Sequence, residues 1–343
     1  MADIVMADDG ISFDGASLDD GPLGGAETAF LSLARALAAR GHRVRVRNRC
    51  AAPMVRDGVA WAPLSDGLPE TCDLYIANRS DRLLSVLGGA RRTIFWIHNP
   101  ARYLLKFRYL RKLWRRRPPI VFSGPYHAAS YPTWAPDGGR VIIPYGISEA
   151  FRTVCRDGTP PPRAVFTSSP LRGLDWVLDL WRERIRPACP SAELHVFSGA
   201  ATYGSFGTSK LAAIRPVLEK ATALAADGVV LRQPVPKGAL AAELARARVL
   251  LYRGDPGETF CLAAGEAQAA GVPVVVQDIG CVAERVMDGE TGFVARDDGA
   301  FAESVIRLLG DDALWQAQSR AALARQRGWG WNEAAAAFEE LIS

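Results

Sequence analysis

Residues 258–276 read Glu-Thr-Phe-Cys-Leu-Ala-Ala-Gly-Glu-Ala-Gln-Ala-Ala-Gly-Val-Pro-Val-Val-Val. Small and apolar side chains predict a helix over Phe260–Ala270, with Thr259 as its N-cap and Gly271 as its stop. The run Pro273–Gln277 predicts a buried strand directly after the helix. A helix that leads into a β-branched, fully apolar strand is typical of α/β proteins with parallel sheets.

The start of this helix is a candidate anion site. The backbone N–H groups of its expected first turn, those of Phe260, Cys261 and Leu262, have no partner within the helix, and the helix dipole adds positive potential there. Such a site suits a pyrophosphate. Glu258 lies in the loop before it and Glu266 about two turns along the helix, where each carboxylate can accept two vicinal hydroxyls. The alternative is two ordinary surface glutamates.

Strands and helices alternate in both directions from this stretch. In the first half the expected strands are Ala2–Met6, Arg43–Arg47, Leu74–Ala77, Thr93–Ile97, Ile120–Ser123 and Val141–Ile143, and the clearest helix is Thr28–Arg40. In the second half the expected strands are Ala164–Thr167, Glu193–Ser198, Val229–Gln233, Val249–Tyr252 and Pro273–Gln277, separated by helices Leu174–Ile185, Ser209–Ala226, Lys237–Ala245, Phe260–Ala270 and Ala300–Leu309.

The chain of 343 residues is long enough for about two domains. The Pro- and Gly-rich segment Arg156–Arg163 is the best linker candidate. We therefore expect an N-terminal Rossmann-like domain over residues 1–155 and a C-terminal one over 156–325. The fold class is α/β, with both parallel sheets facing a central cleft. Residues 326–343, after the break at Gly328-Trp329-Gly330-Trp331, are expected as a terminal helix that crosses back to the first domain.

Composition excludes several classes of protein. Apolar residues make up 49% and charged residues 23%, which is ordinary for a globular protein and excludes a disordered chain. The longest apolar runs are far shorter than the roughly 20 residues of a membrane span. The start of the chain has no signal-peptide pattern, and the six cysteines form no close pair. We expect reduced thiols and a cytoplasmic protein.

The segment Arg102–Arg117 has eight Lys or Arg residues and no acidic residue. Leu104, Phe107, Leu110, Leu113 and Trp114 recur in it at helical spacing. A basic amphipathic helix of this kind suits an anionic membrane surface, such as the cytoplasmic face of the inner membrane. The alternatives are a solvated helix that packs its apolar stripe on the sheet, and nucleic acid, for which no reading module accompanies the helix.

The acid-rich stretch Asp8–Gly21 precedes Gly24 and Gly25. It contains five aspartates and is expected as a flexible, solvated loop, with an acceptor-side role as the alternative. The paired aspartates elsewhere lie in loops or at helix starts, so we expect no metal site.

Several motifs together resemble the retaining family 4 glycosyltransferases of the GT-B fold, also called glycosyl transferases group 1. They are the Glu-x7-Glu pair with its Gly-Val-Pro-Val-Val continuation, the opening Gly24-Gly25 loop with Arg40-Gly41-His42-Arg43-Val44, the segment Ile143-Pro144-Tyr145-Gly146-Ile147, and Gly289-Glu290-Thr291-Gly292-Phe293. Their order and spacing along most of the chain are similar to that family.

The resemblance implies roles for individual residues. Glu266 would hold the ribose of a nucleotide, and Glu258 would contact hydroxyls of the donor sugar. Gly24 and Gly25 would allow a loop to approach the donor phosphates closely. His98, at the end of an expected strand, would face the donor sugar.

One position departs from the family pattern. The family usually places an Arg and a Lys five residues apart on the pyrophosphate, whereas this chain has Thr167 and Arg172 there. Arg172 can still neutralise the leaving diphosphate. Ser168 or Ser169 would supply hydrogen bonds in place of the second charge.

The resemblance implies a retaining, metal-independent glycosyltransferase without cofactor. The donor would be a nucleotide-diphosphate sugar, with UDP expected first and GDP next. The acceptor would be a glycan or a lipid-linked, cell-envelope molecule. The alternative is a non-catalytic nucleotide-sugar or glycan-binding protein on the same fold. An NAD-dependent oxidoreductase is disfavoured, because no Gly-x-Gly-x-x-Gly follows the first strand.

Overall fold

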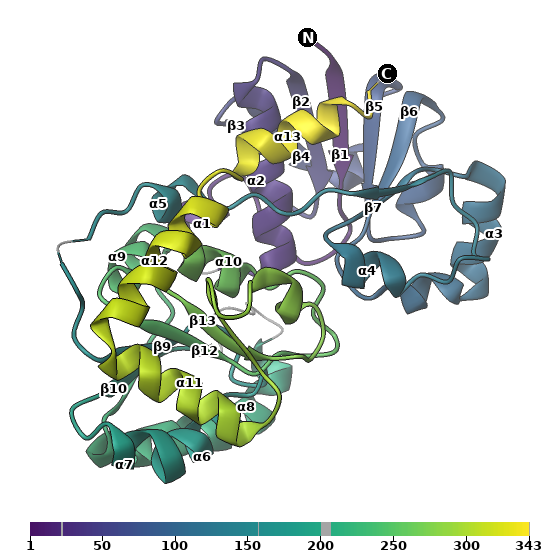
Figure 1. Ribbon diagram of the computed structural model, residues 1–343. Helices are drawn as coiled ribbons and strands as arrows, with labels where there is room; N and C mark the ends of the chain where they lie inside the picture. The colour runs from purple at the N-terminus through teal and green to yellow at the C-terminus, as the bar shows by residue number, and fades with distance from the viewer. Residues whose placement is uncertain (22, 157, 200–206, 343) are drawn as a thin grey trace. The chain divides into compact units, whose positions relative to one another are not determined.

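The computed structural model describes residues 1–342 except 22, 157 and 200–206. Part of the expected linker, residue 157, therefore lies outside the described residues. The chain divides into two compact units. The first contains residues 1–20, 25–146 and 329–343, and the second contains residues 21–24 and 147–328. Each unit has its own sheet (Figure 1), and each is described by itself.

The first unit is built on an eight-stranded sheet with the order β3-β4-β2-β1-β5-β6-β7-β8. Its strands are β1 Asp3–Ala7, β2 Arg43–Asn48, β3 Met54–Arg56, β4 Val59–Pro63, β5 Thr71–Asn78, β6 Gly89–Trp96, β7 Ile120–Phe122 and β8 Arg140–Ile142. All neighbours pair in parallel except β3 and β4, which form an antiparallel hairpin. Arginines alternate with buried valines along β2, and the strand expected at Arg43–Arg47 is confirmed.

The longest helix of this unit, α2, is amphipathic. The helices of the unit are α1 Ser17–Asp20, α2 Gly25–Ala39, α3 Phe107–Arg116, α4 Pro125–Ala129 and α13 Trp331–Glu339. The large apolar side chains of α2, which include Phe30, Leu33 and Leu37, are buried, and the helix expected at Thr28–Arg40 is confirmed. The last helix, α13, packs against α2 (Figure 1).

An aromatic cluster joins α13 to the sheet of the first unit. Trp96 at the end of β6 is fully buried, with the Phe338 ring 5.1 Å away edge-on and the Phe30 ring stacked at 6.5 Å. Glu339 accepts hydrogen bonds from Arg40 at 2.6 Å and pairs with His42 at 2.7 Å. Residues 329–343 therefore complete the core of the first unit.

The second unit is built on a six-stranded, fully parallel sheet with the order β11-β10-β9-β12-β13-β14. The strands are β9 Arg163–Phe166, β10 Glu193–Phe197, β11 Val229–Arg232, β12 Val249–Tyr252, β13 Val274–Gln277 and β14 Gly292–Ala295. The helices are α5 Glu149–Arg152, α6 Leu174–Leu180, α7 Arg186–Ala188, α8 Gly207–Ala223, α9 Lys237–Leu244, α10 Leu262–Ala269, α11 Asp298–Gly310 and α12 Asp312–Gln326. Helices α10 and α11 both pack against β12 and β13 (Figure 1).

The division between the units falls after Gly146, so residues 147–155 group with the second unit. Helix α5 explains this, because it packs against α9 and α10. Its buried Phe151 ring has the Lys237 ammonium 5.7 Å from the ring centre.

In both sheets the strand order reverses next to the first strand of the unit. The reversal lies between β1 and β5 in the first unit and between β9 and β12 in the second. Loops at the carboxyl ends of such strands diverge and leave room for a ligand. A ligand site is therefore expected at the carboxyl ends of β1 and β5 and of β9 and β12. Within the described residues, no helix has both the length and the apolarity to cross a membrane.

Candidate functional site

The second unit brings two of the predicted residues into direct contact at its switch point. Arg172, in the turn between β9 and α6, lies with Nη1 2.7 Å from Oε1 of Glu258, which follows β12. Tyr252, the last residue of β12, donates its hydroxyl proton to Oε2 of Glu258 at 2.6 Å. Both carboxylate oxygens are therefore engaged and the side chain is held in one orientation.

Burial and mutual attraction shift the pKa values of both Glu258 and Arg172. Burial raises the pKa of Glu258, and the Arg172 charge and the Tyr252 hydrogen bond only partly oppose it. Burial lowers the pKa of Arg172, but the Glu258 carboxylate outweighs it and the net direction is upward. The guanidinium therefore stays charged, as leaving-group stabilisation requires.

The start of α10 differs from the prediction. Thr259 is not the N-cap, because α10 begins at Leu262 and its N-cap is Cys261, which has the left-handed φ of 58° and makes no side-chain cap. Phe260 is fixed before the helix by its ring, over which the Arg285 guanidinium stacks at 4.2 Å. Of the three predicted amides, only that of Leu262 lies in the first helical turn. Those of Phe260 and Cys261 lie in the bend before it.

Glu266 lies in the second turn of α10, closer to its start than expected. The residue is only 4% exposed. Its Oε1 accepts a hydrogen bond from Nζ of Lys237 at 2.6 Å, and Lys237 is the first residue of α9. The predicted ribose residue therefore has a cationic partner that the sequence pattern did not indicate.

The remaining residues predicted in the second unit lie in the turn after β9. The Ser168 carbonyl accepts a hydrogen bond from the Ser198 hydroxyl at 2.5 Å, and the Ser169 hydroxyl accepts one from the Leu171 N–H at 3.3 Å. The Arg172 N–H donates to the Ser169 carbonyl at 2.9 Å, which closes the turn. Thr167 is the first residue after β9. Because threonine is uncharged, this position supplies no second positive charge beside Arg172.

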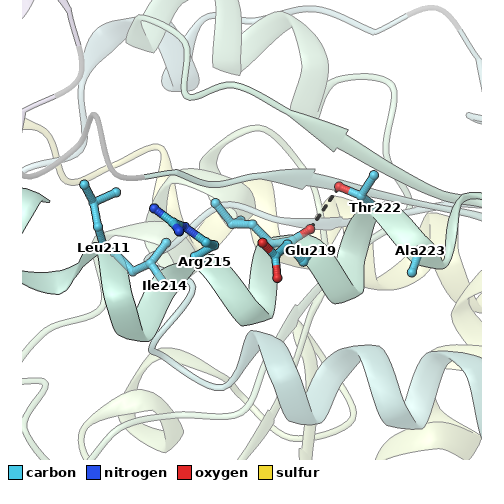
Figure 2. A pocket seen from close by; sticks show the side chains of 7 residues that line it. Leu211, Ile214, Arg215, Glu219, Thr222 and Ala223 are labelled. Atoms are coloured by element: carbon cyan, nitrogen blue, oxygen red, sulfur yellow. Dashed lines mark hydrogen bonds between the residues drawn. The ribbon is translucent and has the colours of Figure 1, made fainter.

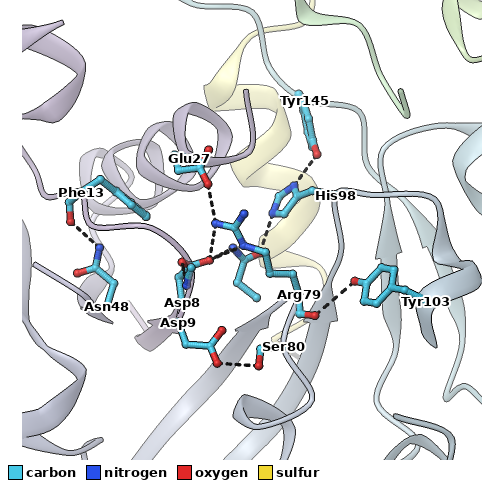
Figure 3. Close-up of polar contacts among 12 residues, drawn as sticks. Asp8, Asp9, Phe13, Glu27, Asn48, Arg79, Ser80, His98, Tyr103 and Tyr145 are labelled. Carbon is cyan, nitrogen blue, oxygen red and sulfur yellow. Dashed lines mark hydrogen bonds and ion pairs between the residues drawn. The ribbon is translucent and has the colours of Figure 1, made fainter. Parts of the chain in front are cut away.

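In the first unit, a network of charged residues lies at the corresponding edge (Figure 3). Asp8 follows β1 and is fully buried. Nε of Arg79, after β5, donates to Oδ2 of Asp8 at 2.9 Å, and Nη2 donates to Oε1 of Glu27 at 2.8 Å. The Gly10 N–H donates to Oδ1 of Asp8 at 2.7 Å. The expectation that the stretch from Asp8 is simply solvated is wrong for Asp8 itself, because Arg79 compensates its buried charge.

His98 lies in the same network, two residues after β6. Asn78 donates its side-chain N–H to Asp8, which leaves its Oδ1 2.6 Å from Nε2 of His98. Since that oxygen can only accept, Nε2 carries the proton. Nδ1 then accepts from the Tyr145 hydroxyl at 2.5 Å (Figure 3). Burial and the Arg79 charge hold the pKa of His98 well below its ordinary value, so the ring is neutral.

The two glycines expected at the donor phosphates take different places. Gly24 lies in the loop before α2, and Gly25 is the first residue of α2 itself. The helix therefore starts three residues before the predicted Thr28.

Sequence reasoning missed Lys237, Tyr252, Asn78, Arg79 and the role of Asp8. Four of these lie at or just after a predicted strand end, on strands β1, β5 and β12. That position was the available signal. The signal for Lys237 was weaker, since the sequence shows only a lysine that follows Pro236 at the start of an expected helix.

A hollow of about 480 Å³ runs along one face of α8 (Figure 2). Its lining consists of Leu211, Ile214, Arg215, Leu218, Glu219, Thr222 and Ala223. The Thr222 hydroxyl is used within the helix, where it donates to the Leu218 carbonyl at 3.0 Å. None of the predicted site residues lines this hollow. Across the described part of the chain, no three His, Cys, Asp or Glu side chains form a group that could hold a metal ion.

The chain is similar in sequence to known glycosyltransferases. Residues 162–311 match the model of the family described as Glycosyl transferases group 1. The D-inositol 3-phosphate glycosyltransferase of Streptomyces avermitilis is 37% identical over 120 residues, which are 34% of this chain and 26% of that protein. The glycogen synthase of Mycobacterium tuberculosis is 43% identical over 86 residues, which are 23% of this chain and 20% of that protein. The chain spans only about a quarter of the length of the curated relatives it matches.

Solved structures resemble the whole chain. Sucrose-phosphate synthase from Thermosynechococcus elongatus superposes with a TM-score of 0.73 at 17% identity, over 99% of this chain and 98% of that one. Anabaena Alr3699/HepE, solved in complex with UDP and glucose, gives a TM-score of 0.72 at 13% identity over 99% of both chains. At these identities the likeness shows the fold, which is the GT-B type with two Rossmann-like units.

Proposed function

We propose that the protein is a retaining glycosyltransferase, because residues 162–311 match the model of the glycosyl transferases group 1 family. It transfers a sugar from a nucleotide-diphosphate sugar to a hydroxyl of a glycan or lipid-linked acceptor. The reaction uses no metal ion. We place it in the cytoplasm, where nucleotide sugars are made.

The observation that carries the proposal is the contact of Arg172 with Glu258 at the switch point of the second unit. A guanidinium and a carboxylate at 2.7 Å offer one group for a diphosphate and one for sugar hydroxyls. The first turn of α10 begins four residues after Glu258 and adds backbone N–H groups and the helix dipole. These elements together fit a ligand that has a diphosphate between two sugars.

The proposed reaction exchanges one bond at the anomeric carbon. The bond from that carbon to the β-phosphate oxygen breaks, and the acceptor oxygen forms a new bond on the same face of the sugar. The acceptor proton passes to the departing diphosphate. Negative charge grows on the leaving group, and Arg172 with the α10 amides stabilises it because these groups are already oriented.

The donor we propose is a UDP-sugar, with a GDP-sugar as the second choice. HepE, which has the same fold, is solved with UDP and with UDP-glucose. Glu266 would accept the ribose hydroxyls, with Lys237 holding the carboxylate in place. Glu258 would accept hydroxyls of the transferred sugar.

One observation favours a second candidate, a non-catalytic nucleotide-sugar binding protein. The uncharged Thr167 follows β9 where the family usually has an arginine. A site with one cation instead of two would stabilise a leaving diphosphate less. Binding would remain while turnover would be lost.

The test is a panel of UDP-, GDP-, ADP- and TDP-sugars, measured by calorimetry for binding and by release of nucleoside diphosphate for turnover. We expect one sugar nucleotide to bind and to be hydrolysed slowly, with release of its nucleoside diphosphate. Glu266→Ala should abolish binding, and Glu258→Ala should retain much of it while lowering the rate about 100-fold or more. Glu303→Ala, on an exposed face of α11, is the matched control.

The outcomes separate the two candidates. Binding without release, also in the presence of lipid-linked acceptors, would favour the binding protein. No binding by any of the four nucleotides would contradict both. Wild-type turnover in both glutamate variants would remove these residues from the site.

A further inference from the structure

Helix α3 presents two aromatic side chains that the described residues of the first unit leave exposed. Of the apolar stripe predicted over Arg102–Arg117, Leu104 lies before the helix and is buried, and Leu113 of α3 is buried together with Tyr109 in the core of the unit. Phe107 and Trp114 are 78% and 70% exposed. Packing on the sheet therefore accounts for only part of the stripe. Figure 1 shows α3 on the outside of its unit.

The exposed rings lie on one line along the helix. Phe107 and Trp114 are seven residues apart, close to two full turns, so their side chains share a face. Arg111 lies between them on that face, and Arg115 lies beside Trp114, one turn beyond Arg111. All four residues are exposed. The result is an aromatic row flanked by guanidinium groups.

Most cations of the segment Arg102–Arg117 have no acidic partner among the residues that the structure describes. Arg108 and Lys112 pair with Asp81 at 3.4 Å and 2.9 Å. The others form no ion pair with any acidic side chain in the described residues. They are Arg102, Lys106, Arg111, Arg115, Arg116 and Arg117. The surface around the aromatic row thus has positive charge that the protein leaves uncompensated.

We propose that this face, formed by Phe107, Arg111, Trp114 and Arg115, docks the protein on a bilayer that contains anionic lipids. A bilayer offers a layer of phosphates above an apolar layer. The guanidinium groups match the phosphates, and the two rings reach the boundary with the acyl chains. Trp is typical of that boundary, because its ring is apolar and its N–H is polar.

A nucleic acid matches the charge but not the rings. Two rings two turns apart on a straight helix cannot stack successive bases, which requires neighbouring platforms. A duplex would leave both rings against phosphates or solvent. Binding of the α3 face to a bilayer does not depend on which sugar the protein transfers.

The test uses the full chain and sedimentation with vesicles of phosphatidylcholine, with or without phosphatidylglycerol, at low and high salt. We expect binding only to the anionic vesicles, weakened by salt. Phe107→Ala/Trp114→Ala should lower the partition coefficient about tenfold or more, because two interfacial anchors are removed. Arg111→Glu/Arg115→Glu should lower it at least as much.

Matched controls separate this surface from general charge. Arg91→Glu/Arg92→Glu makes the same charge change at two exposed residues of β6 in the same unit, and Val55→Ala removes an exposed apolar side chain of β3. Both should bind like the wild type. Equal binding to neutral vesicles would overturn the proposal, as would unaffected α3 variants. The proposal would also be overturned if the protein bound a labelled DNA duplex tightly and did not bind the vesicles.

Discussion

Each of the two glutamates of the candidate site in the second unit has a cation within hydrogen-bond distance. Arg172 contacts Glu258, and Lys237 contacts Glu266. A ligand with a diphosphate and free hydroxyls can join such pairs, with its phosphates near a cation and its hydroxyls donating to a carboxylate. Each buried charge then keeps a polar or charged partner when the ligand enters, which limits the desolvation cost of binding.

Lys237→Met tests the second of these pairs. Without the ammonium, the nearly buried Glu266 carboxylate loses its partner and its fixed orientation. We expect the Kd for the nucleotide sugar to rise about tenfold, which corresponds to about 1.4 kcal/mol. Calorimetry measures this, with Lys210→Met on α8 as the control. An unchanged Kd would exclude Lys237 from the donor site.

Buried histidines predict how stability depends on pH. Burial lowers the pKa of His127 to about 4 and holds that of His98 well below its ordinary value. The unfolded chain binds these protons near pH 6.5, so the folded state loses stability as the pH falls from about 6.5 toward 4. At pH 5 the loss from His127 alone should be about 2 kcal/mol.

Urea unfolding at pH 7 and pH 5 measures this loss. The variant His98→Gln/His127→Gln should show a smaller decrease between the two pH values, although its stability at pH 7 is lower. An equal decrease in the variant would mean that other groups cause the acid sensitivity.

The sequence could name residues at this scale but not their partners. Glu258 and Glu266 followed from a local motif, and Arg172 followed from its place in the pattern of the resembled family. Their contacts Tyr252 and Lys237 depend on which strand and helix ends meet. The pairing of Asp8 with Arg79 joins residues 71 positions apart. An aspartate after a strand looks solvated in sequence, and only the fold brings the guanidinium that makes its burial possible.

At the scale of elements, periodicity predicted most helices and strands of both units. The start of α10 was missed because a left-handed Cys261 interrupts an otherwise helical pattern. The hairpin of β3 and β4 was also missed. Its signal was present, since Asp57-Gly58 has positive φ at both positions, the geometry of a two-residue hairpin turn.

Gly146 controls how closely α13 approaches the rest of the first unit. A Cβ at this position would lie 2.4 Å from backbone atoms of Gly330 and Trp331, at the start of α13. Gly146→Ala should therefore displace α13 and lower the free energy of unfolding by at least about 2 kcal/mol. Denaturant unfolding measures this, and Gly88→Ala, with open space around its Cβ, is the control. Wild-type stability in Gly146→Ala would show that α13 shifts at no cost.

At the scale of the whole molecule, the chain leaves the first unit after Gly146 and returns to it at Trp329. Alternating strands and helices predicted two Rossmann-like units. They could not predict that α5 packs with the second unit, because that depends on the buried side chain of Phe151 and its neighbours in three dimensions.

Deleting residues 329–343 should affect the two units unequally. The deletion removes Phe338 from Trp96 and Glu339 from Arg40 and His42. We expect the free energy of unfolding of the first unit to fall by more than about 3 kcal/mol, as it does when a large buried aromatic side chain is truncated. Hydrogen exchange should show lost protection in β1, β5 and β6 and retained protection in β12 and β13. Deletion of residues 341–343 alone is the control, and uniform loss in both units would contradict the expectation.

The late return of the chain has a consequence for synthesis on the ribosome. The 182 residues from 147 to 328 are made between the two parts of the first unit, which takes about 10 to 40 seconds at typical elongation rates. During that time α13 has not yet been made, so the side of Trp96 that Phe338 will cover is exposed as an aromatic surface of the kind that chaperones bind. The second unit can meanwhile close around its own strands, and it would be the first part of the protein to mature.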